Sequence, residues 1–317
     1  MATTPSGSWD FKLTAAQLIA RAAKNLGILA AGGTIVSADE TDLLQTLNVI
    51  AHEFQGTSDM MPGMKVWTRQ RVTLLLAKGQ QTYTIGPATT DSRASTQVGR
   101  TTIDVAEAIG QTVLSVTATN DTTTYPGTTL TMTAADIIGI EQNDDTVFWT
   151  TVSSISAGDT VTVATGLDVA AAVGNYVWWF TSRAQRFPVI ESALLRDENR
   201  NDVPLVVYRD AREYDQGVVD KYADGMPTAI LVEPLTLNTR ITLNSQPDEM
   251  SYMIVLTVLY PAEDYDATTN DIAFPQEWYG LLEWELTLRQ CPMYGKAWTP
   301  EMQLNYTNAM GRARGLN

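Results

Sequence analysis

The chain has one cysteine and one histidine among its 317 residues. The single cysteine, Cys291, excludes an intramolecular disulfide and a cluster of thiolate metal ligands. The single histidine, His52, excludes a histidine-rich metal site within one chain and leaves one candidate for a histidine-based triad. Because His52 lies beside the apolar stripe of a predicted helix, we expect it to be a solvated or capping residue.

Long apolar runs and basic residues are also scarce. No run approaches the roughly eighteen apolar residues of a membrane-spanning helix, and no charged-then-apolar leader opens the chain. We therefore expect a soluble protein without a membrane partner, made in a reducing compartment. The 36 acidic residues outnumber the 21 basic ones and give a net charge of −15. This balance argues against a protein that grips nucleic acid by its phosphates.

Two amphipathic helices joined by a glycine loop are predicted near the N-terminus. The first has a capping box, Thr14 with Gln17, and is stopped by Gly27, and the second is expected to open with a capping box of Ser37 and Glu40. Apolar residues recur at helical spacing on one face of each helix. They are Ala15, Leu18, Ile19, Ala22, Ala23 and Leu26 in the first, and Leu43, Leu44, Leu47, Ile50, Ala51 and Phe54 in the second.

Such a helical hairpin needs a further partner to cover its apolar seam, and the other end of the chain supplies one. A helix is predicted after Phe274-Pro275, and a last helix begins at Thr299-Pro300, where proline suits the first helical position. Between the two ends we predict a small sheet, with a hairpin around Lys78-Gly79-Gln80 and a central strand at 252–260. The two ends should meet in one helical bundle.

Residues 86–183 differ in composition from the sequence on either side. Threonine is abundant, turn residues recur every eight to twelve positions, and ten acidic residues face three arginines without any lysine. This pattern is typical of a compact antiparallel β-barrel or sandwich. The predicted fold class is α+β, with a discontinuous helical-bundle domain of residues 1–85 and 184–317 and an inserted β-module of residues 86–183.

A calcium-binding loop is suggested by alternating oxygen ligands at positions 264, 266, 268 and 270. Thr269 stands where an EF-hand loop needs glycine, and Pro275 stands where a bidentate glutamate belongs. The mismatch argues against calcium, and no metal site is predicted.

Close acidic pairs could in principle perform glycosidase chemistry. Glu283 with Glu285 and Asp144 with Asp145 are such pairs, but close spacing arises by chance in a chain with 36 acids. No catalytic residue and no cofactor are predicted, and the chain is not expected to be an enzyme.

Four segments of the sequence resemble, by their motifs and their order, segments of a known protein family. They are residues 16–27 (AQLIARAAKNLG), residues 78–86 (KGQQTYTIG), residues 190–227 from IESALLRD to the helix with Tyr214, Lys221-Tyr222 and GMP, and residues 274–278 (FPQEW). Together they cover most of the host domain. In this order they resemble the head-to-tail adaptor proteins of short-tailed bacteriophages, the family of tail accessory, packaged-DNA-stabilising and tail-tubular adaptor proteins.

The resemblance implies a structural virion protein at the portal vertex, assembled in the host cytoplasm. Such adaptors form a ring, usually of twelve copies, between the portal protein and the tail nozzle, help to retain packaged DNA, and offer a platform for tail fibres or spikes. DNA would pass through the ring without specific binding, as the acidic charge also suggests. The resemblance makes the C-terminal segment the candidate portal-docking segment: Met310, Gly311, Arg312, Ala313, Arg314, Gly315, Leu316 and Asn317.

A ring also needs head-to-tail contacts between copies. We expect them to use a helix face left over once the core is filled, and Tyr279 and Leu286 are the candidate interface residues. Two alternatives remain at this point. One is a tail protein whose β-module anchors fibres or binds carbohydrate through Trp178 and Trp179, and the other is a cell-wall hydrolase that uses an acidic pair.

Overall fold

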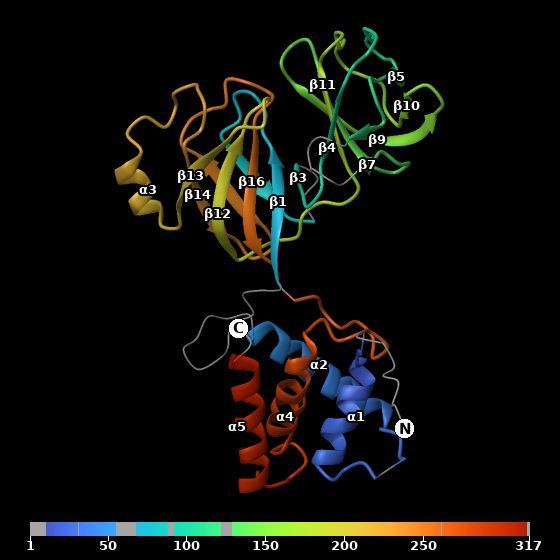
Figure 1. The fold of residues 1–317 in the computed structure, drawn as a ribbon, viewed down its shortest axis with the longest axis vertical. Helices are drawn as coiled ribbons and strands as arrows, with labels where there is room; N and C mark the ends of the chain where they lie inside the picture. The colour runs from blue at the N-terminus through green and yellow to red at the C-terminus, as the bar shows by residue number, and fades with distance from the viewer. Residues whose placement is uncertain are drawn as a thin grey trace, which may run out of the picture. The chain divides into compact units, whose positions relative to one another are not determined.

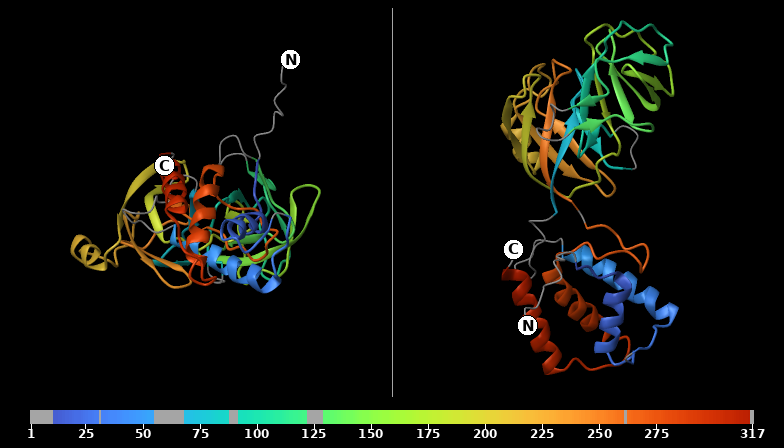
Figure 2. Two further views of the ribbon diagram at one scale, coloured as in Figure 1. Left: turned by 90° about the horizontal axis from the view of Figure 1, so that it is seen from below. Right: turned by 45° about the vertical axis from the view of Figure 1, so that its right-hand side comes forward.

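The computed structural model describes residues 11–30, 32–54, 68–87, 92–121, 129–260 and 262–315. It contains helices and strands in two compact units, Met1–Thr68 with Pro261–Asn317 and Arg69–Tyr260 (Figures 1 and 2). We call them the helical unit and the strand unit. The mixed composition confirms the predicted α+β class, with helices contributed by both chain ends.

Helix α1 (Ala15–Asn25) has the predicted boundaries. The Gln17 amide donates to Thr14 Oγ1 at 3.3 Å and the Thr14 amide donates to Gln17 Oε1 at 3.1 Å, which completes the capping box. Gly27 follows with a φ of +70°, a conformation that glycine adopts without strain.

The second capping box was predicted incorrectly. Helix α2 (Ser37–Glu53) is preceded by Val36, whose side chain makes no capping bond, and Ser37 is already the first helical residue. The Val36 carbonyl accepts the Glu40 amide at 3.0 Å and so starts the first turn one residue early. The predicted stop at Gly56 lies outside the described residues.

The helices of both ends share one hydrophobic core. A 3₁₀ turn, η1 (Gln276–Trp278), leads into α4 (Tyr279–Gln290), and α5 (Pro300–Gly315) follows. The ring of Phe54, the residue that follows α2, lies 5.8 Å from that of Trp278, centroid to centroid. The fully buried leucines and isoleucines of this core are Leu18, Ile19, Leu43, Leu47 and Ile50 from the N-terminal part and Leu281, Leu282 and Leu286 from the C-terminal part.

The segment that leads into η1 is bonded to the first two helices. The amides of Ala15 and Ala16, which have no partner inside α1, donate to the carbonyls of Asn270 and Thr268 at 2.9 and 2.8 Å. Asn48 of α2 makes two hydrogen bonds to the backbone of residue 265. The C-terminal part of the chain therefore satisfies polar groups of the N-terminal part as well as covering its apolar face.

The strand unit contains an eight-stranded sheet in the order β2-β15-β14-β13-β12-β16-β1-β3. Its strands are β1 (Arg69–Leu75), β2 (Thr82–Ile85), β3 (Ala94–Ser95), β12 (Val189–Arg196), β13 (Asp202–Tyr208), β14 (Ala229–Pro234), β15 (Thr239–Leu243) and β16 (Met253–Leu259). Neighbours are antiparallel except β13 and β14, which are parallel and joined through α3 (Ala211–Gly217). As predicted, the apolar strand β16 is central, between β12 and β1.

The predicted hairpin around Lys78-Gly79-Gln80 is wrong. β1 pairs with β16 and β3, whereas β2 pairs with β15. The intervening turn is held elsewhere, because the Gly79 amide donates to Pro247 and the Tyr83 hydroxyl donates to the Gln80 carbonyl. The inward side chains of β1 and β2 still share one core with the other strands, so the sheet is curled.

The middle part of the strand unit's sequence forms a six-stranded sheet, in the order β4-β11-β8-β9-β10-β5. Its strands are β4 (Gly99–Thr102), β5 (Val113–Ser115), β8 (Ile137–Glu141), β9 (Val147–Ser156), β10 (Thr160–Val163) and β11 (Tyr176–Phe180), and the pair β6 (Asn120–Asp121) and β7 (Leu130–Thr131) lies beside it. A bridge between Ile103 and Val116 joins its two edges, so it forms a small closed barrel. This barrel is the antiparallel module that the sequence predicted.

The small barrel contains an internal repeat that the sequence analysis missed. Residues 104–110 (DVAEAIG) and 168–174 (DVAAAVG) run antiparallel to each other. Glu107 and Ala171, which are equivalent in the two copies, exchange backbone hydrogen bonds of 2.8 and 3.0 Å. The flanking backbone hydrogen bonds are related in the same way. The Ile103 amide donates to the Asn175 carbonyl at 2.9 Å, and the equivalent Leu167 amide donates to the Gln111 carbonyl at 3.1 Å. The barrel therefore has an approximate two-fold axis at this pair.

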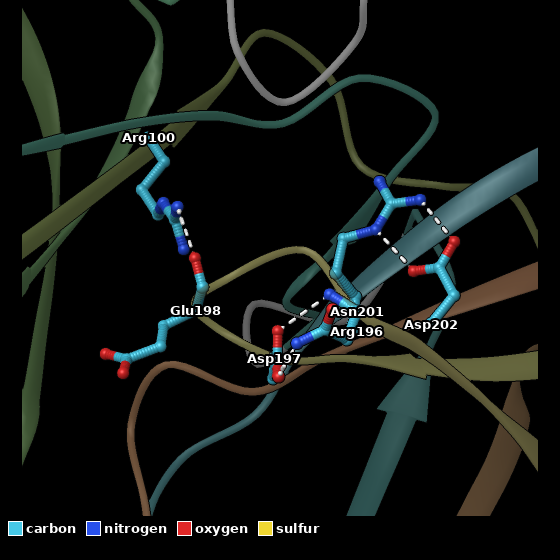
Figure 3. A network of polar contacts seen from close by, with 6 residues as sticks. All are labelled: Arg100, Arg196, Asp197, Glu198, Asn201 and Asp202. Carbon is cyan, nitrogen blue, oxygen red and sulfur yellow. Dashed lines mark hydrogen bonds and ion pairs between the residues drawn. The ribbon is translucent and has the colours of Figure 1, made fainter.

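The two sheets of the strand unit are packed together. Leu75, Met250 and Met253 contact Trp178 and Phe180 in one apolar cluster. Polar contacts flank the cluster, and Figure 3 shows Arg100 Nη2 donating to the Glu198 carbonyl at 3.3 Å. Lys78 Nζ lies 2.6 Å from Asp145 Oδ2 in a second contact.

The predicted domain boundaries need correction for this reason. The chain divides at 68/69 and 260/261, not at 85/86 and 183/184. Residues 69–85 and 184–260 build a sheet with its own core and pack on the small barrel, so they belong with the barrel and not with the helices. Entry and exit of the strand unit are adjacent, because Arg69 pairs with Leu259. Within the described residues, no helix is long and apolar enough to cross a membrane.

Candidate interaction surfaces

The predicted portal-docking segment is mostly the end of a helix. Met310 to Gly315 form the last turns of α5, and Leu316 and Asn317 lie outside the described residues. Ala313 is fully buried, Met310 is half-buried, and Arg312 and Arg314 are exposed. The described part of the segment is packed on the bundle through Ala313.

α5 presents one inner and one outer face. Ala309 and Ala313 pack inward with half-buried Tyr306, and burial raises the pKa of the Tyr306 hydroxyl, as does the neighbouring Glu285 carboxylate. The outer face carries Leu304, which is 60% exposed, and no acid follows Glu301 to the end of the sequence. The exposed residues of this face are Glu301, Gln303, Leu304, Thr307, Asn308, Gly311 and Arg312. Its one acid, Glu301, lies in the first turn, so the rest of the face is neutral to basic.

The two residues predicted to form the subunit interface are not on the surface. Tyr279 is 6% exposed and Leu286 is fully buried, and both belong to the core of the helical unit. The reason is that α4 is surrounded by α1, α2 and α5, so no apolar face of it is left over.

The tryptophans proposed to bind carbohydrate are also buried. Trp178 and Trp179 are each 2% exposed. They point to opposite faces of β11, Trp179 into the core of the small barrel and Trp178 into the junction with the large sheet. Neither ring is available to stack on a sugar.

The acidic pairs have structural partners. Glu283 accepts from Arg21 Nε at 2.7 Å and from Asn25 Nδ2 at 2.8 Å, which joins α4 to α1. Glu285 is 4% exposed and accepts from Arg289 Nε at 2.8 Å, and Arg289 also pairs with Glu53 of α2.

The second pair, Asp144 and Asp145, occupies an exposed turn. Asp144 accepts from the backbone and hydroxyl of Thr146, and these hydrogen bonds lower the pKa of its carboxyl group. Asp145 pairs with Lys78. Both acids therefore have contacts that account for their positions without catalysis.

The histidine and the calcium-like loop lie together in the helical unit. His52 Nε2 is 2.5 Å from Asp264 Oδ1, and both side chains are about half exposed or more. The carbonyls of Thr268 and Asn270 accept the amides at the start of α1. Among the described residues, no group of three or more histidine, cysteine or acidic side chains is placed to hold a metal ion. The loop fastens helices to each other.

A small apolar pocket opens at one end of the eight-stranded sheet, and no sequence motif pointed to it. Its volume is about 100 Å³. The lining residues are Pro188, Val189, Ile190, Val207, Arg209, Val232 and Pro234. Two arginines lie at this end: Arg209 donates to the Ile190 carbonyl at 2.6 Å, and Arg186 donates to the Leu235 carbonyl at 2.6 Å. The site unites residues from three strands, which sequence spacing could not show.

Comparison with known proteins leaves the family open. No model of a known protein family matches this sequence, and no curated protein matches it. Among solved structures, similarity is found to the VP16-VP17 complex, a complex of the two major capsid proteins of bacteriophage P23-77. The identity is 10%, the TM-score is 0.15, and the similarity covers 64% of this chain and 80% of that chain. A TM-score this low establishes neither a shared fold nor a shared function, so the function must be argued from the chain's own residues.

Proposed function

We propose that the protein is a structural virion component, a ring-forming adaptor between the portal and the tail nozzle of a short-tailed phage. In this role it has no catalytic activity, binds the portal through its helical unit, helps to retain packaged DNA, and carries tail fibres or spikes. The proposal starts from the sequence resemblance to head-to-tail adaptors.

The observation that carries the proposal is the closure of both chain ends into one helical unit. Two of the four segments behind the resemblance, residues 16–27 and 274–278, lie in this unit and contribute to the same core. The other two, residues 78–86 and 190–227, lie in the strand unit and contribute to its eight-stranded sheet. The outer two segments of the resemblance thus belong to the helical unit, and the inner two belong to the strand unit.

The outer face of α5 is the proposed portal-binding surface. It combines an exposed aliphatic side chain, Leu304, with the positive charge of Arg312 near the helix C-terminus. Charged and apolar groups on one exposed helix face suit docking to another protein. The remainder of the acidic chain would repel DNA phosphates and let DNA pass without binding.

Native mass spectrometry of the full chain mixed with the portal ring of the same virus tests this proposal. We expect several copies of the chain on one portal ring, and about as many as there are portal subunits. A one-to-one complex, or no complex, would overturn the adaptor role.

A variant pair examines the docking face in the same experiment. Leu304→Ser with Arg312→Ser should weaken portal binding by about tenfold or more, as truncation of contact residues does in interfaces. Val105→Ser with Val173→Ser removes two exposed aliphatic side chains from the strand unit and serves as the matched control. Equal binding by both variants would show that α5 is not the portal-binding surface.

A further inference from the structure

The loop after α3 displays two large apolar side chains to solvent. Val219 is 98% exposed and Tyr222 is 81% exposed. α3 itself protrudes from one side of the sheet in Figures 1 and 2. Solvent-exposed aliphatic and aromatic side chains at this level are costly to keep in water and gain free energy when a partner covers them.

Hydrogen bonds hold the loop in place. The side chain of Gln81, just before β2, donates to the Lys221 carbonyl, and the Gln246 amide donates to the Ala223 carbonyl at 2.9 Å. Gly225 donates back to the Gln246 carbonyl at 2.9 Å. Val219 and Tyr222 are therefore presented on a fixed backbone, which reduces the entropy that a partner must remove on binding.

The pocket at the end of the sheet is complementary to Val219 in size. Its volume of about 100 Å³ is below the roughly 150 Å³ of a cavity that accepts benzene, so it admits an aliphatic side chain and not a tyrosine ring. Tyr222 could then cover only the rim. Apolar walls from Ile190, Val207 and Val232 suit a valine.

The charges around the two sites are also complementary. Asp220 and Asp224 flank the exposed side chains of the loop, and both are exposed. Arg186 and Arg209 flank the pocket, and in the described part of the chain each donates to a backbone carbonyl. Within the described residues, no carboxylate lies at ion-pair distance from either guanidinium. Opposite charges of this kind steer and orient an association.

The two sites lie at opposite ends of the same sheet. Pro234 of the pocket pairs with Thr239, at the start of β15. The α3 loop lies beyond the other end, because the Tyr214 hydroxyl donates to the Leu243 carbonyl and the loop bonds to Gln246. The sites are about 14 Å apart along the strand direction at 3.4 Å per residue, too far to contact each other within one chain.

We propose that the Val219–Tyr222 loop of one copy docks into the Arg209 pocket of a second copy of this chain. Val219 fills the apolar pocket, Tyr222 covers its rim, and Asp220 and Asp224 face Arg209 and Arg186. Because the two surfaces differ and lie at opposite ends, the contact is head-to-tail and continues from copy to copy until a ring closes. The contact between copies is argued independently of the proposed function, whereas the closed ring rests on that proposed function.

Sedimentation velocity of the full chain without portal protein, from about 1 to about 100 μM, tests the contact. The loop variant is Val219→Ser with Tyr222→Ser, and the pocket variant is Arg209→Glu. Matched controls are Val105→Ser with Val173→Ser for the loop and Arg200→Glu for the pocket, since these side chains are exposed elsewhere on the strand unit. Unchanged thermal unfolding verifies that the variants fold.

We expect wild-type association to rise with concentration, the two site variants to associate about ten- to a hundredfold more weakly, and the controls to match wild type. An equimolar mixture of loop and pocket variants should form a heterodimer that does not grow, because each partner keeps one intact site. A monomeric wild type, site variants that associate like wild type, or a mixture without heterodimer would each overturn the proposal.

The results distinguish failure of the adaptor role from failure of the contact between copies. A chain that associates through these sites but does not bind portal protein contradicts the adaptor role alone. A chain that binds the portal in many copies while both site variants assemble normally contradicts this contact alone.

Discussion

Arg21 and Glu283 are 262 positions apart in the sequence, yet Arg21 Nε lies 2.7 Å from Glu283 Oε2. Glu283 also accepts from Asn25, so one carboxylate of α4 holds two consecutive turns of α1. This contact joins the first and last parts of the chain in the helical unit.

A double-mutant cycle should measure that link. Arg21→Ala and Glu283→Ala are expected to show a coupling free energy of about 0.5 to 1 kcal/mol, because the Arg21 side chain is half exposed and screened by solvent. Urea unfolding of the helical unit at low and at high salt gives the values. Additive effects at both salt concentrations would show that the pair does not link the chain ends.

Leu286→Ala distinguishes a core residue from an interface residue. Leu286 is fully buried, so we expect the free energy of unfolding to fall by about 2 to 5 kcal/mol in the isolated chain. Leu304→Ala on the outer face of α5 is the control and should change it by less than about 0.5 kcal/mol. Equal free energies of unfolding for the two variants would show that Leu286 is not a core residue.

Arg289→Met should alter the dependence of stability on pH. Its hydrogen bond and charge lower the pKa of Glu53 below the ordinary 4.5. A lowered folded-state pKa contributes stability above the unfolded-state value, and this stability is lost as the pH falls through the folded-state value. Glu53 is half exposed, so the contribution is well below 1 kcal/mol. The variant should therefore lose less stability than wild type between about pH 5 and about pH 3.

The same substitution has a larger effect at neutral pH. It leaves the buried Glu285 carboxylate without its cation, which costs about 3 to 5 kcal/mol. Urea midpoints at several pH values measure both effects. A variant as stable as wild type at pH 7 would show that the pair is not needed in the core.

Two glycine substitutions should act in opposite directions. A Cβ at Gly99 would lie 2.2 Å from ring atoms of Trp179, so Gly99→Ala is expected to destabilise the strand unit by about 1 to 3 kcal/mol. A Cβ at Gly280 in α4 would meet only the Ala309 Cβ at 3.9 Å. Gly280→Ala should thus stabilise the helical unit by up to about 1 kcal/mol. Thermal unfolding monitored by circular dichroism compares the two, and a change of the same sign in both contradicts the packing.

Local sequence signals predicted the helices best. Thr14 with Gln17, the glycine at 27 and the proline at 300 mark helix ends through hydrogen bonds and backbone preferences within a few residues. Strand β16 was also identified, because a strand covered on both faces lacks the polar alternation of an exposed one. These features depend on nearby residues alone.

Features that depend on distant partners were missed. Tyr279 and Leu286 were placed on a free face because the sequence does not show that three helices surround α4. The hairpin at Gly79 failed because β2 pairs with β15, more than 150 positions later. The pocket near Arg209 could not be predicted either, since its walls come from strands that only the folded sheet brings together. The repeat at 104–110 and 168–174 was visible in the sequence and was overlooked.

A cryo-electron microscopy reconstruction of the tail vertex of the virus particle tests the adaptor role most directly. The account predicts a closed ring directly beneath the portal, into which the helical and strand units fit as separate bodies, with the outer face of α5 against the portal. Density for this chain in the capsid shell or in the distal fibres, or its absence from the particle, would contradict it.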